Sequence, residues 1–257
     1  MPVSKVNSQR NEEHDFWERW KNKTKQELGY IRALKKARQF ILRKLPHKKV
    51  CSIYVKGSFG RRELTPKSDI DVVIVTPDSK MLNEITDLAE RYHKELKPAE
   101  IVTPYSLWEL KHSKSYPYRK KSAKPAVFLF HLEHHKLIYG KPLRKENYKI
   151  RNPKQRLKDM IYFMEKDFIP AYYTGSPSSG FRNLAKQIFW LADLELMIKE
   201  KHSPHTFKEM AKRINDTHHI VHDAIKIRNM SNTKDQKLRK DFIKKLKKYL
   251  TELKKLV

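Results

Sequence analysis

The sequence predicts an α+β fold in which a small mixed β-sheet flanked by helices is followed by an all-α helical bundle. Within the first 150 residues, short segments rich in β-branched residues alternate with helical patterns, which favours a mixed sheet. From residue 151 onward the apolar residues recur only at helical spacing, which predicts a bundle.

Three regions are expected along the chain. A helical segment at residues 1–46 packs on an α/β domain at residues 47–150, and the bundle occupies residues 151–257. The helical pattern runs from Asn11 to about Leu45, and Pro46 ends it because proline lacks a backbone donor. A basic stretch after Lys114 and the apolar segment that ends at Pro142 precede the second boundary.

The α/β domain contains three predicted strands and one predicted helix. The strands are expected at residues 50–55, 69–76 and 100–103, and the helix at residues 82–96. Apolar periodicity in the bundle predicts five helices, at residues 157–168, 181–198, 206–214, 220–230 and 242–256.

Charge points to a polyanionic partner. The formal net charge is +28, and only residues 51–100, with eight basic and nine acidic side chains, lack a basic excess. A charge of this size favours binding to nucleic acid, although basic residues on solvated helix faces would give the same composition. The single cysteine, Cys51, permits no disulfide within the chain, and no apolar run is long enough to span a membrane. We therefore expect a cytoplasmic protein with no membrane partner.

The segment GSFGRRELTPKSDIDVVIV contains the candidate catalytic residues. Asp69 and Asp71 stand two residues apart in a predicted strand, so both carboxylates project from the same face. Two divalent cations would convert their mutual repulsion into a binding site. Mg²⁺ fits best because it prefers oxygen ligands and shares its coordination shell with substrate phosphates, and Mn²⁺ is an alternative. Asp69 and Asp71 are thus the candidate ligands of two metal ions.

The turn before this strand contains candidate phosphate ligands. Gly57 allows close backbone approach, and Ser58 offers a hydroxyl and an N–H group. Arg61, Arg62 and Lys67 are candidates to neutralise the remaining charge of a triphosphate. Together with the two aspartates, these five residues predict a site for a nucleoside triphosphate.

The run from Gly57 to Val75 resembles the signature of the DNA polymerase β-like nucleotidyltransferase superfamily: Gly-Ser, about ten residues, and Asp-x-Asp in a β-branched strand. It is most similar to the minimal and kanamycin nucleotidyltransferase branch, and the layout extends the resemblance to about residues 48–143. The resemblance implies transfer of a nucleoside monophosphate from a nucleoside triphosphate, with release of pyrophosphate. Gly57 and Ser58 would hold the phosphates, and Asp69 and Asp71 the metal ions.

The same resemblance implies a third carboxylate on a neighbouring strand. Glu100, in KPAEIVTPYSLWEL, occupies the matching place and is the third candidate catalytic and metal-binding residue. Members of the superfamily more often have aspartate there. Glu95 and Glu109 are weaker candidates because both fall on helical stretches.

Downstream of LIYGKPL, the helical remainder resembles a HEPN-like bundle or the C-terminal domain of kanamycin nucleotidyltransferase. HEPN ribonucleases carry an arginine followed at short spacing by a histidine. Arg213 and His218 in RINDTH match that spacing, which a chain this rich in basic residues also produces by chance. A ribonuclease-like site at these two residues remains open.

The predicted function is metal-dependent nucleotidyl transfer, with ATP as the expected nucleotide and RNA as the expected acceptor because of the charge. A protein side chain and a small molecule such as an aminoglycoside are alternative acceptors. A non-catalytic nucleic-acid-binding protein is a further alternative, which the intact Gly57, Ser58, Asp69 and Asp71 disfavour. Phe59, Tyr105, Tyr116 and Tyr118 lie near basic residues and are candidates for base stacking. The transferred nucleotide, the acceptor and the oligomeric state are not determined by the sequence.

Overall fold

The computed structural model describes residues 13–65, 68–174, 180–204, 206–230 and 235–257. The chain forms two compact units, residues 1–150 and 151–257. Among the described residues, no helix combines the length and the apolar character needed to cross a lipid bilayer.

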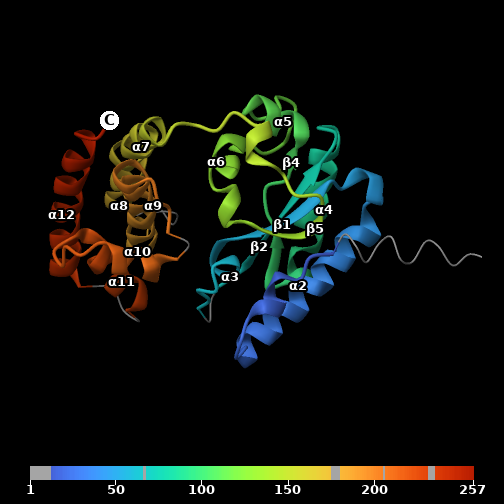
Figure 1. Cartoon of the computed structure of the whole chain (residues 1–257), viewed down its shortest axis with the longest axis horizontal. Helices are drawn as coiled ribbons and strands as arrows, with labels where there is room; N and C mark the ends of the chain where they lie inside the picture. The colour runs from blue at the N-terminus through green and yellow to red at the C-terminus, as the bar shows by residue number, and fades with distance from the viewer. Residues whose placement is uncertain (1–12, 66–67, 175–179, 205, 231–234) are drawn as a thin grey trace, which may run out of the picture. The chain divides into compact units, whose positions relative to one another are not determined.

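The first unit is built around a mixed β-sheet (Figure 1). Its strands are β1 (Ser52–Lys56), β2 (Ile70–Thr76), β3 (Ala99–Ile101), β4 (Tyr105–Ser106) and β5 (Lys136–Gly140). The order is β3-β2-β1-β5, and β4 also pairs with β2. β1 runs antiparallel to β2 and β5, whereas β2 runs parallel to β3 and β4. The predicted mixed sheet is confirmed.

Helical segments surround the sheet. They are η1 (Phe16–Arg19), α2 (Lys25–Lys44), η2 (His47–Lys49), α3 (Gly57–Gly60), α4 (Met81–Leu96), α5 (Leu107–His112), α6 (Pro125–Phe130), η3 (Leu132–His134) and η4 (Lys145–Asn147). One face of the sheet packs on α2 and α4 through Ile53, Ile70 and Val72. The other face packs on α5 and α6 through Tyr54 and Val73. The helices thus bury both faces of the central strands.

The N-terminal helical pattern is broken into η1 and α2. Thr24 ends the interruption because it caps α2: its hydroxyl accepts from the Glu27 N–H at 3.1 Å, and the Glu27 carboxylate accepts from the Thr24 N–H at 2.7 Å. Phe16 and Trp20 pack edge-on or tilted against the buried ring of Phe59. The segment before α2 is therefore part of the core of the first unit.

Arg38 fixes the start of the described chain to the sheet. Its side chain is only 3% exposed and donates to Glu13 at 2.6 Å, to Asp15 at 2.7 Å and to the Ile138 carbonyl on β5 at 3.1 Å. Lys35 adds a second ion pair to Asp15 at 2.9 Å. An almost completely buried guanidinium requires such partners, because an unpaired buried charge is strongly destabilising.

Three differences from the sequence-based expectation concern the strands. β3 begins and ends earlier than predicted, at Ala99–Ile101, because its pairing with β2 covers only three residues. β4 was not predicted, because it is only two residues long and is defined by its pairing with the end of β2. β5 was not predicted as a strand either. Its sequence, KLIYG, is short and follows helical segments, so only its pairing with β1 identifies it.

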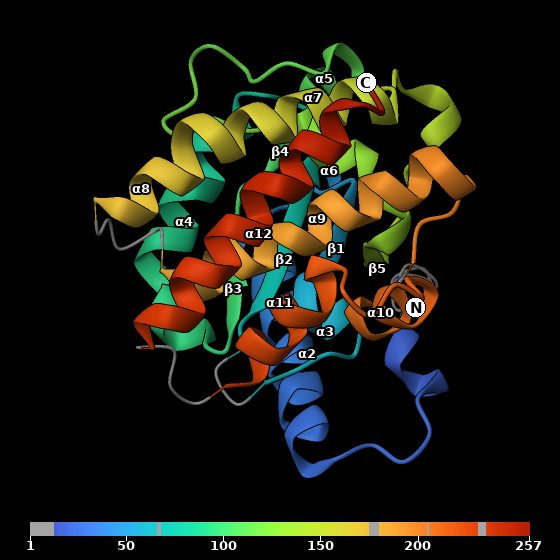
Figure 2. The ribbon, with the colours of Figure 1, turned by 90° about the vertical axis from the view of Figure 1, so that its left-hand side faces the viewer.

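The second unit is entirely helical over its described residues. Its elements are α7 (Pro153–Phe163), the π-helical turn η5 (Met164–Phe168), α8 (Ile169–Tyr173), α9 (Phe181–Glu200), α10 (Phe207–Arg213), α11 (Ile220–Asn229) and α12 (Gln236–Lys254). α9 packs against α7 and α11, and α11 packs against α12 (Figure 2). On α12, Lys244, Lys247 and Lys248 are exposed, whereas Lys245 forms an ion pair with Asp223.

Glu195 joins three helices of the second unit. Its carboxylate accepts from the Tyr249 hydroxyl at 2.6 Å and from Lys199 at 2.5 Å, and lies 3.2 Å from the His219 ring nitrogen. Burial alone would raise the pKa of Glu195, but these contacts outweigh it and lower the pKa from its ordinary value of 4.5 to about 2. The buried Tyr249 hydroxyl has a raised pKa because of its burial and the adjacent carboxylate.

We predict that Glu195→Gln destabilises the helical unit in a pH-dependent way. A carboxyl whose pKa is lowered on folding stabilises the fold above its unfolded pKa, and loses this effect as pH falls from 4.5 toward 2. The difference in unfolding free energy between variant and wild type should reach up to about 3 kcal/mol at pH 7 and shrink below pH 4.5. Urea unfolding across pH measures it.

Glu200→Gln is the matched control, because Glu200 is on the same helix in an exposed ion pair with Arg213. It should change stability by less than about 1 kcal/mol at either pH. Equal losses in the two variants, or a Glu195 effect that does not vary with pH, would contradict the assigned role of Glu195.

Candidate active site

Three charged side chains stand side by side at one end of the sheet. Asp71 is the second residue of β2; its register partner on β1 is Lys56 and its partner on β3 is Glu100. Register partners on adjacent strands share a face, and the strands lie about 4.8 Å apart. The Asp71 carboxylate is therefore flanked by a cation on one side and by a second carboxylate on the other.

Asp69 lies one residue before β2 and is exposed, whereas Asp71 is half-buried. Ile70 between them is fully buried in the core. A buried residue between two solvent-accessible ones matches the alternation of an extended chain. Because the hydrogen bond from the Ile70 N–H to the Pro98 carbonyl, at 2.9 Å, fixes the start of the strand, it also fixes where both aspartates lie.

Glu100 is about one third exposed and lies 3.6 Å from the Lys97 ammonium. The two weaker carboxylate candidates lie elsewhere. Glu95 is exposed near the end of α4. Glu109 is fully buried on α5, where it pairs with Arg119 at 2.7 Å. Of these three glutamates, only Glu100 is the register partner of Asp71.

Gly57 leaves open the space beside Asp71. Its φ is +80°, in the region that favours glycine, and a Cβ atom there would meet Asp71 Oδ2 at 2.9 Å. The backbone of the turn can therefore lie against the Asp71 carboxylate only because residue 57 has no side chain. Ser58 follows on the short helix α3 and is half-buried.

The basic candidates of the turn differ in their partners. Arg61 Nε donates to Glu63 at 3.0 Å. Arg62 is held by the N-terminal segment: its guanidinium donates to both Glu27 oxygens, at 2.6 and 3.2 Å, and lies 5.2 Å from the centre of the Trp20 ring. Its contact with Glu27 lowers the pKa of that carboxyl. Lys67 lies outside the described residues.

Lys56 is a charged neighbour of the site that the sequence did not reveal as a candidate. Its side chain forms no ion pair or hydrogen bond within the described part of the chain, and it immediately precedes Gly57. Burial, and then the positive charges of Lys56, His134 and Arg61, lower the pKa of the nearby His135 from 6.5 to about 3. The imidazole is therefore neutral at physiological pH. The signal in the sequence was the position of Lys56 directly before the Gly-Ser pair.

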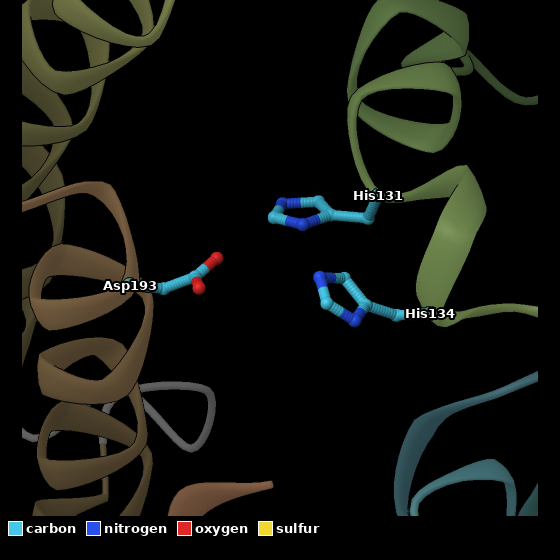
Figure 3. A group of neighbouring side chains, drawn as sticks. All are labelled: His131, His134 and Asp193. Carbon is cyan, nitrogen blue, oxygen red and sulfur yellow. The ribbon is translucent and has the colours of Figure 1, made fainter. Parts of the chain in front are cut away.

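The carboxylates of Asp69, Asp71 and Glu100 are hard oxygen donors, the type of ligand that Mg²⁺ and Mn²⁺ prefer. Figure 3 shows a different set of potential metal ligands, His131, His134 and Asp193. The two histidines belong to the first unit, where their rings lie 6.2 Å apart. Asp193 belongs to the second unit, where it accepts from the Ser203 hydroxyl at 2.6 Å. No metal site is inferred from these three residues, because they belong to two different units.

The residues of the possible ribonuclease-like site are both exposed on the second unit. Arg213 pairs with Glu200 at 2.9 Å. The backbone N–H of His218 donates to Asp216 at 2.8 Å. Neither side chain is buried, and the resemblance of this unit to a HEPN-like bundle stays a prediction.

Comparison with known protein families gives one match to this part of the chain. Residues 34–125, which include β1, β2 and β3, match the family described as nucleotidyltransferase domain. No curated protein sequence matches the chain. Among solved structures, the chain is similar to a spectinomycin adenyltransferase from Enterococcus faecialis crystallised with ATP and spectinomycin. The identity is 16%, the match covers 85% of this chain and 89% of that chain, and the TM-score is 0.46.

At this identity and TM-score, the structural similarity does not identify a substrate. The match of residues 34–125 includes the whole segment from Gly57 to Glu100 that positions the carboxylates. Within the first unit, residues 34–125 thus match a nucleotidyltransferase domain over the segment that contains the candidate catalytic carboxylates.

Proposed function

We propose that the protein transfers a nucleoside monophosphate from ATP to a hydroxyl group of RNA and releases pyrophosphate. One observation supports the chemistry above all others: Asp71 and Glu100 are register partners on adjacent strands, beside a turn that begins with Gly57. In the proposed reaction the acceptor oxygen attacks the α-phosphorus. The bond from this phosphorus to the bridging oxygen of the pyrophosphate then breaks.

Asp69, Asp71 and Glu100 would hold two divalent cations, Mg²⁺ or Mn²⁺. The absence of a side chain at Gly57 supports this assignment, because it leaves space at Asp71 Oδ2 that a Cβ atom would fill. When bound, such cations would neutralise charge on the phosphates and favour loss of the proton from the acceptor hydroxyl. Glu100, on the far side of Asp71 from Lys56, is proposed to orient the acceptor hydroxyl.

The triphosphate would lie on the other side of Asp71. Gly57 and Ser58 offer backbone N–H groups, and Arg61 a charged donor. Lys56 is the additional ligand proposed for this region. It is the β1 register neighbour of Asp71, and its ammonium forms no ion pair among the described residues.

The other two basic candidates are proposed to act differently. Lys67 would neutralise charge on the triphosphate, whereas Arg62 is proposed to position the turn through Glu27.

The proposal of RNA as acceptor rests on charge. The net charge of +28 is far above what solubility requires, and neutralisation of phosphates by lysine and arginine is the main sequence-independent source of affinity for nucleic acid. On α12, the exposed Lys244, Lys247 and Lys248 add to this basic surface. A protein side chain, or a small molecule such as an aminoglycoside, would need no such excess.

The test is a labelling experiment with the full chain. The protein is incubated with Mg²⁺ and each α-³²P-labelled nucleoside triphosphate, in parallel with RNA, total protein or an aminoglycoside. The proposal expects label from ATP in RNA, together with an equal amount of pyrophosphate. If only protein or only the aminoglycoside became labelled, that pool would be the acceptor in place of RNA. If no pool became labelled, the protein would be a non-catalytic binding protein.

We predict that Asp69→Asn and Asp71→Asn each lower the transfer rate by roughly a hundredfold or more, because either change removes a metal-binding carboxylate. Both aspartates are solvent-accessible, so the fold should persist in each variant. Transfer rates at saturating Mg²⁺, with circular dichroism of the same samples, measure the two effects. A variant with the rate of the wild type would disprove the two-metal assignment.

Glu100 and Lys56 flank Asp71 on opposite sides, so their substitutions should affect different kinetic constants. Glu100→Gln should lower kcat roughly tenfold or more while changing the KM for ATP less than about threefold. Lys56→Gln should raise the KM for ATP roughly tenfold, and Lys56→Arg should restore much of it because the charge is retained. Steady-state kinetics measures both constants. If Glu100→Gln and Lys56→Gln changed the same constant, the proposed placement of acceptor and triphosphate on opposite sides of Asp71 would be contradicted.

Gly57→Ala should impair metal and nucleotide binding more than it impairs stability. The added Cβ atom meets Asp71 Oδ2, and the positive φ costs roughly 1–2 kcal/mol for a residue with a side chain. Gly29→Ala is the matched control. Gly29 lies within α2, and a Cβ atom added there would have no neighbour within 4 Å, so alanine should stabilise by roughly 0.5–1 kcal/mol. Calorimetric titration with Mg²⁺ and ATP measures binding; unchanged binding in Gly57→Ala would refute the argument.

A further inference from the structure

Four rings form an exposed ladder on the first unit, away from the carboxylates. Trp108 and His112 on α5 stack with centroids 4.5 Å apart and an angle of 30° between planes. Tyr116 contacts Trp108 edge-on at 5.7 Å, and Tyr118 contacts Tyr116 edge-on at 5.5 Å. Trp108 is 40% exposed and Tyr118 is 79% exposed. We call these four residues the aromatic ladder.

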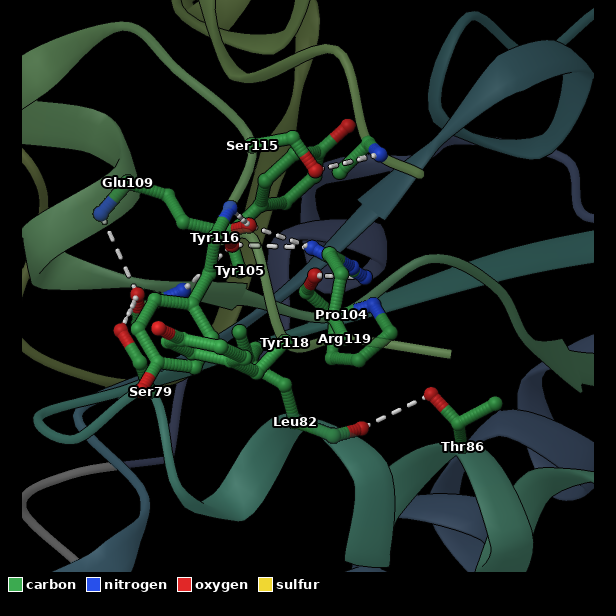
Figure 4. A network of polar contacts seen from close by, with 12 residues as sticks. Ser79, Leu82, Thr86, Pro104, Tyr105, Glu109, Ser115, Tyr116, Tyr118 and Arg119 are labelled. Atoms are coloured by element: carbon green, nitrogen blue, oxygen red, sulfur yellow. Dashed lines mark hydrogen bonds and ion pairs between the residues drawn. The ribbon is translucent and has the colours of Figure 1, made fainter. Parts of the chain in front are cut away.

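A buried ion pair holds the ladder in place (Figure 4). Glu109, next to Trp108, is fully buried and accepts from Arg119 Nη1 at 2.7 and 2.9 Å and from the Tyr116 N–H at 2.7 Å. Arg119 also donates to the Pro104 carbonyl at 3.1 Å. One carboxylate thus binds the segment of Tyr116 and Tyr118 to the helix of Trp108. Buried contacts therefore hold the ladder in place, while Trp108 and Tyr118 remain exposed to solvent.

The surroundings of the ladder are positively charged. Residues 107–124 contain six basic side chains and one acidic side chain, and the acidic one is the buried Glu109. Lys120 and Lys121 pair with Asp87 and Glu90 on α4. Lys111 and Lys114 are exposed and form no ion pair within the described ranges. The exposed rings offer surfaces on which flat apolar groups can stack, and Lys111 and Lys114 offer positive charge. This combination suits a polyanion that carries flat apolar groups.

The sheet sets the distance from the ladder to Asp71. β4 pairs with the last two residues of β2, Val75 and Thr76, and α5 follows β4 directly. Asp71 stands five residues earlier on β2, which is about 17 Å along the strand. The ladder therefore cannot contact the reacting atoms, but a nucleic-acid strand that extends from the site could reach it.

We propose that the aromatic ladder binds unpaired bases of single-stranded RNA, with Lys111 and Lys114 beside its phosphates. Bases stack on exposed aromatic rings whatever their sequence, and each phosphate that a lysine neutralises adds to affinity. Protein-binding surfaces are depleted in lysine, which disfavours a protein partner here. The identification of this strand as the acceptor rests on the proposed function, whereas binding itself does not.

The test measures binding of a fluorescently labelled 12-nucleotide oligouridine by anisotropy, in the full chain with Asp71→Asn to prevent transfer. Trp108→Ala and Tyr118→Ala should each weaken binding by about fivefold or more, and Trp108→Phe should weaken it less because a ring remains. Tyr162→Ala is the matched control. Tyr162 belongs to the second unit and is 60% exposed, and its substitution should change binding less than about twofold.

Two further measurements separate bases from phosphates. An abasic strand of the same length should bind the wild-type ladder and its alanine variants equally. Lys111→Gln combined with Lys114→Gln should reduce the slope of log affinity against log salt by about 1.4. Tyr118 is so exposed that Tyr118→Ala keeps the test valid if a Trp108 variant unfolds.

Oligouridine binding that is unchanged in Tyr118→Ala, or an equal loss for oligouridine and the abasic strand, would overturn the proposal. Transfer to RNA by the active enzyme is measured separately. Ladder-dependent binding without transfer would contradict only the proposed function. Transfer to RNA without ladder-dependent binding would contradict only the inference drawn here.

Discussion

The candidate site depends on the hydrogen bonding of one strand, β2. One edge of β2 pairs along its length with β1, and the other edge pairs with β3 at its start and with β4 at its end. This arrangement places Lys56 and Glu100 on the two sides of Asp71. It places α5, with Trp108 and Glu109, beyond the opposite end of the strand. A shift of either pairing by one residue would send the Asp71 neighbours to the other face of the sheet.

The features that sequence predicted best are local ones. The alternation in IDVVIVT identified β2, and Asp-x-Asp at its start identified Asp69 and Asp71 as a solvent-accessible pair around the buried Ile70. The sequence also singled out Gly57, for close approach to a phosphate, and its positive φ is a local property of one residue, whereas its close approach to Asp71 is not. Hydrophobic periodicity and the backbone preference of single residues can be recognised without knowing which segments of the chain are in contact.

The features that could not be predicted from the sequence depend on contacts between segments that are distant along the chain. Lys56 becomes a neighbour of Asp71 only through the β1–β2 register, and β5 is identified only by its pairing with β1. Phe59 and Tyr105, two of the candidate stacking residues, are 0% and 6% exposed because the core covers them. Tyr116 remains on the surface beside Trp108, which the sequence did not single out. Burial and register are long-range properties that a linear pattern does not encode.

The contact between Arg62 and Glu27 determines how the domain can be divided. The family match begins at residue 34, yet the turn after Gly57 is held by residues that precede it: Glu27 by its carboxylate, and Lys21 and Asn22 by their carbonyls. A fragment cut at the family boundary would keep every proposed metal ligand and lose the anchor of the turn. The smallest piece that can be moved into another protein without releasing this turn therefore begins before Trp20, upstream of the first residue that the family match covers.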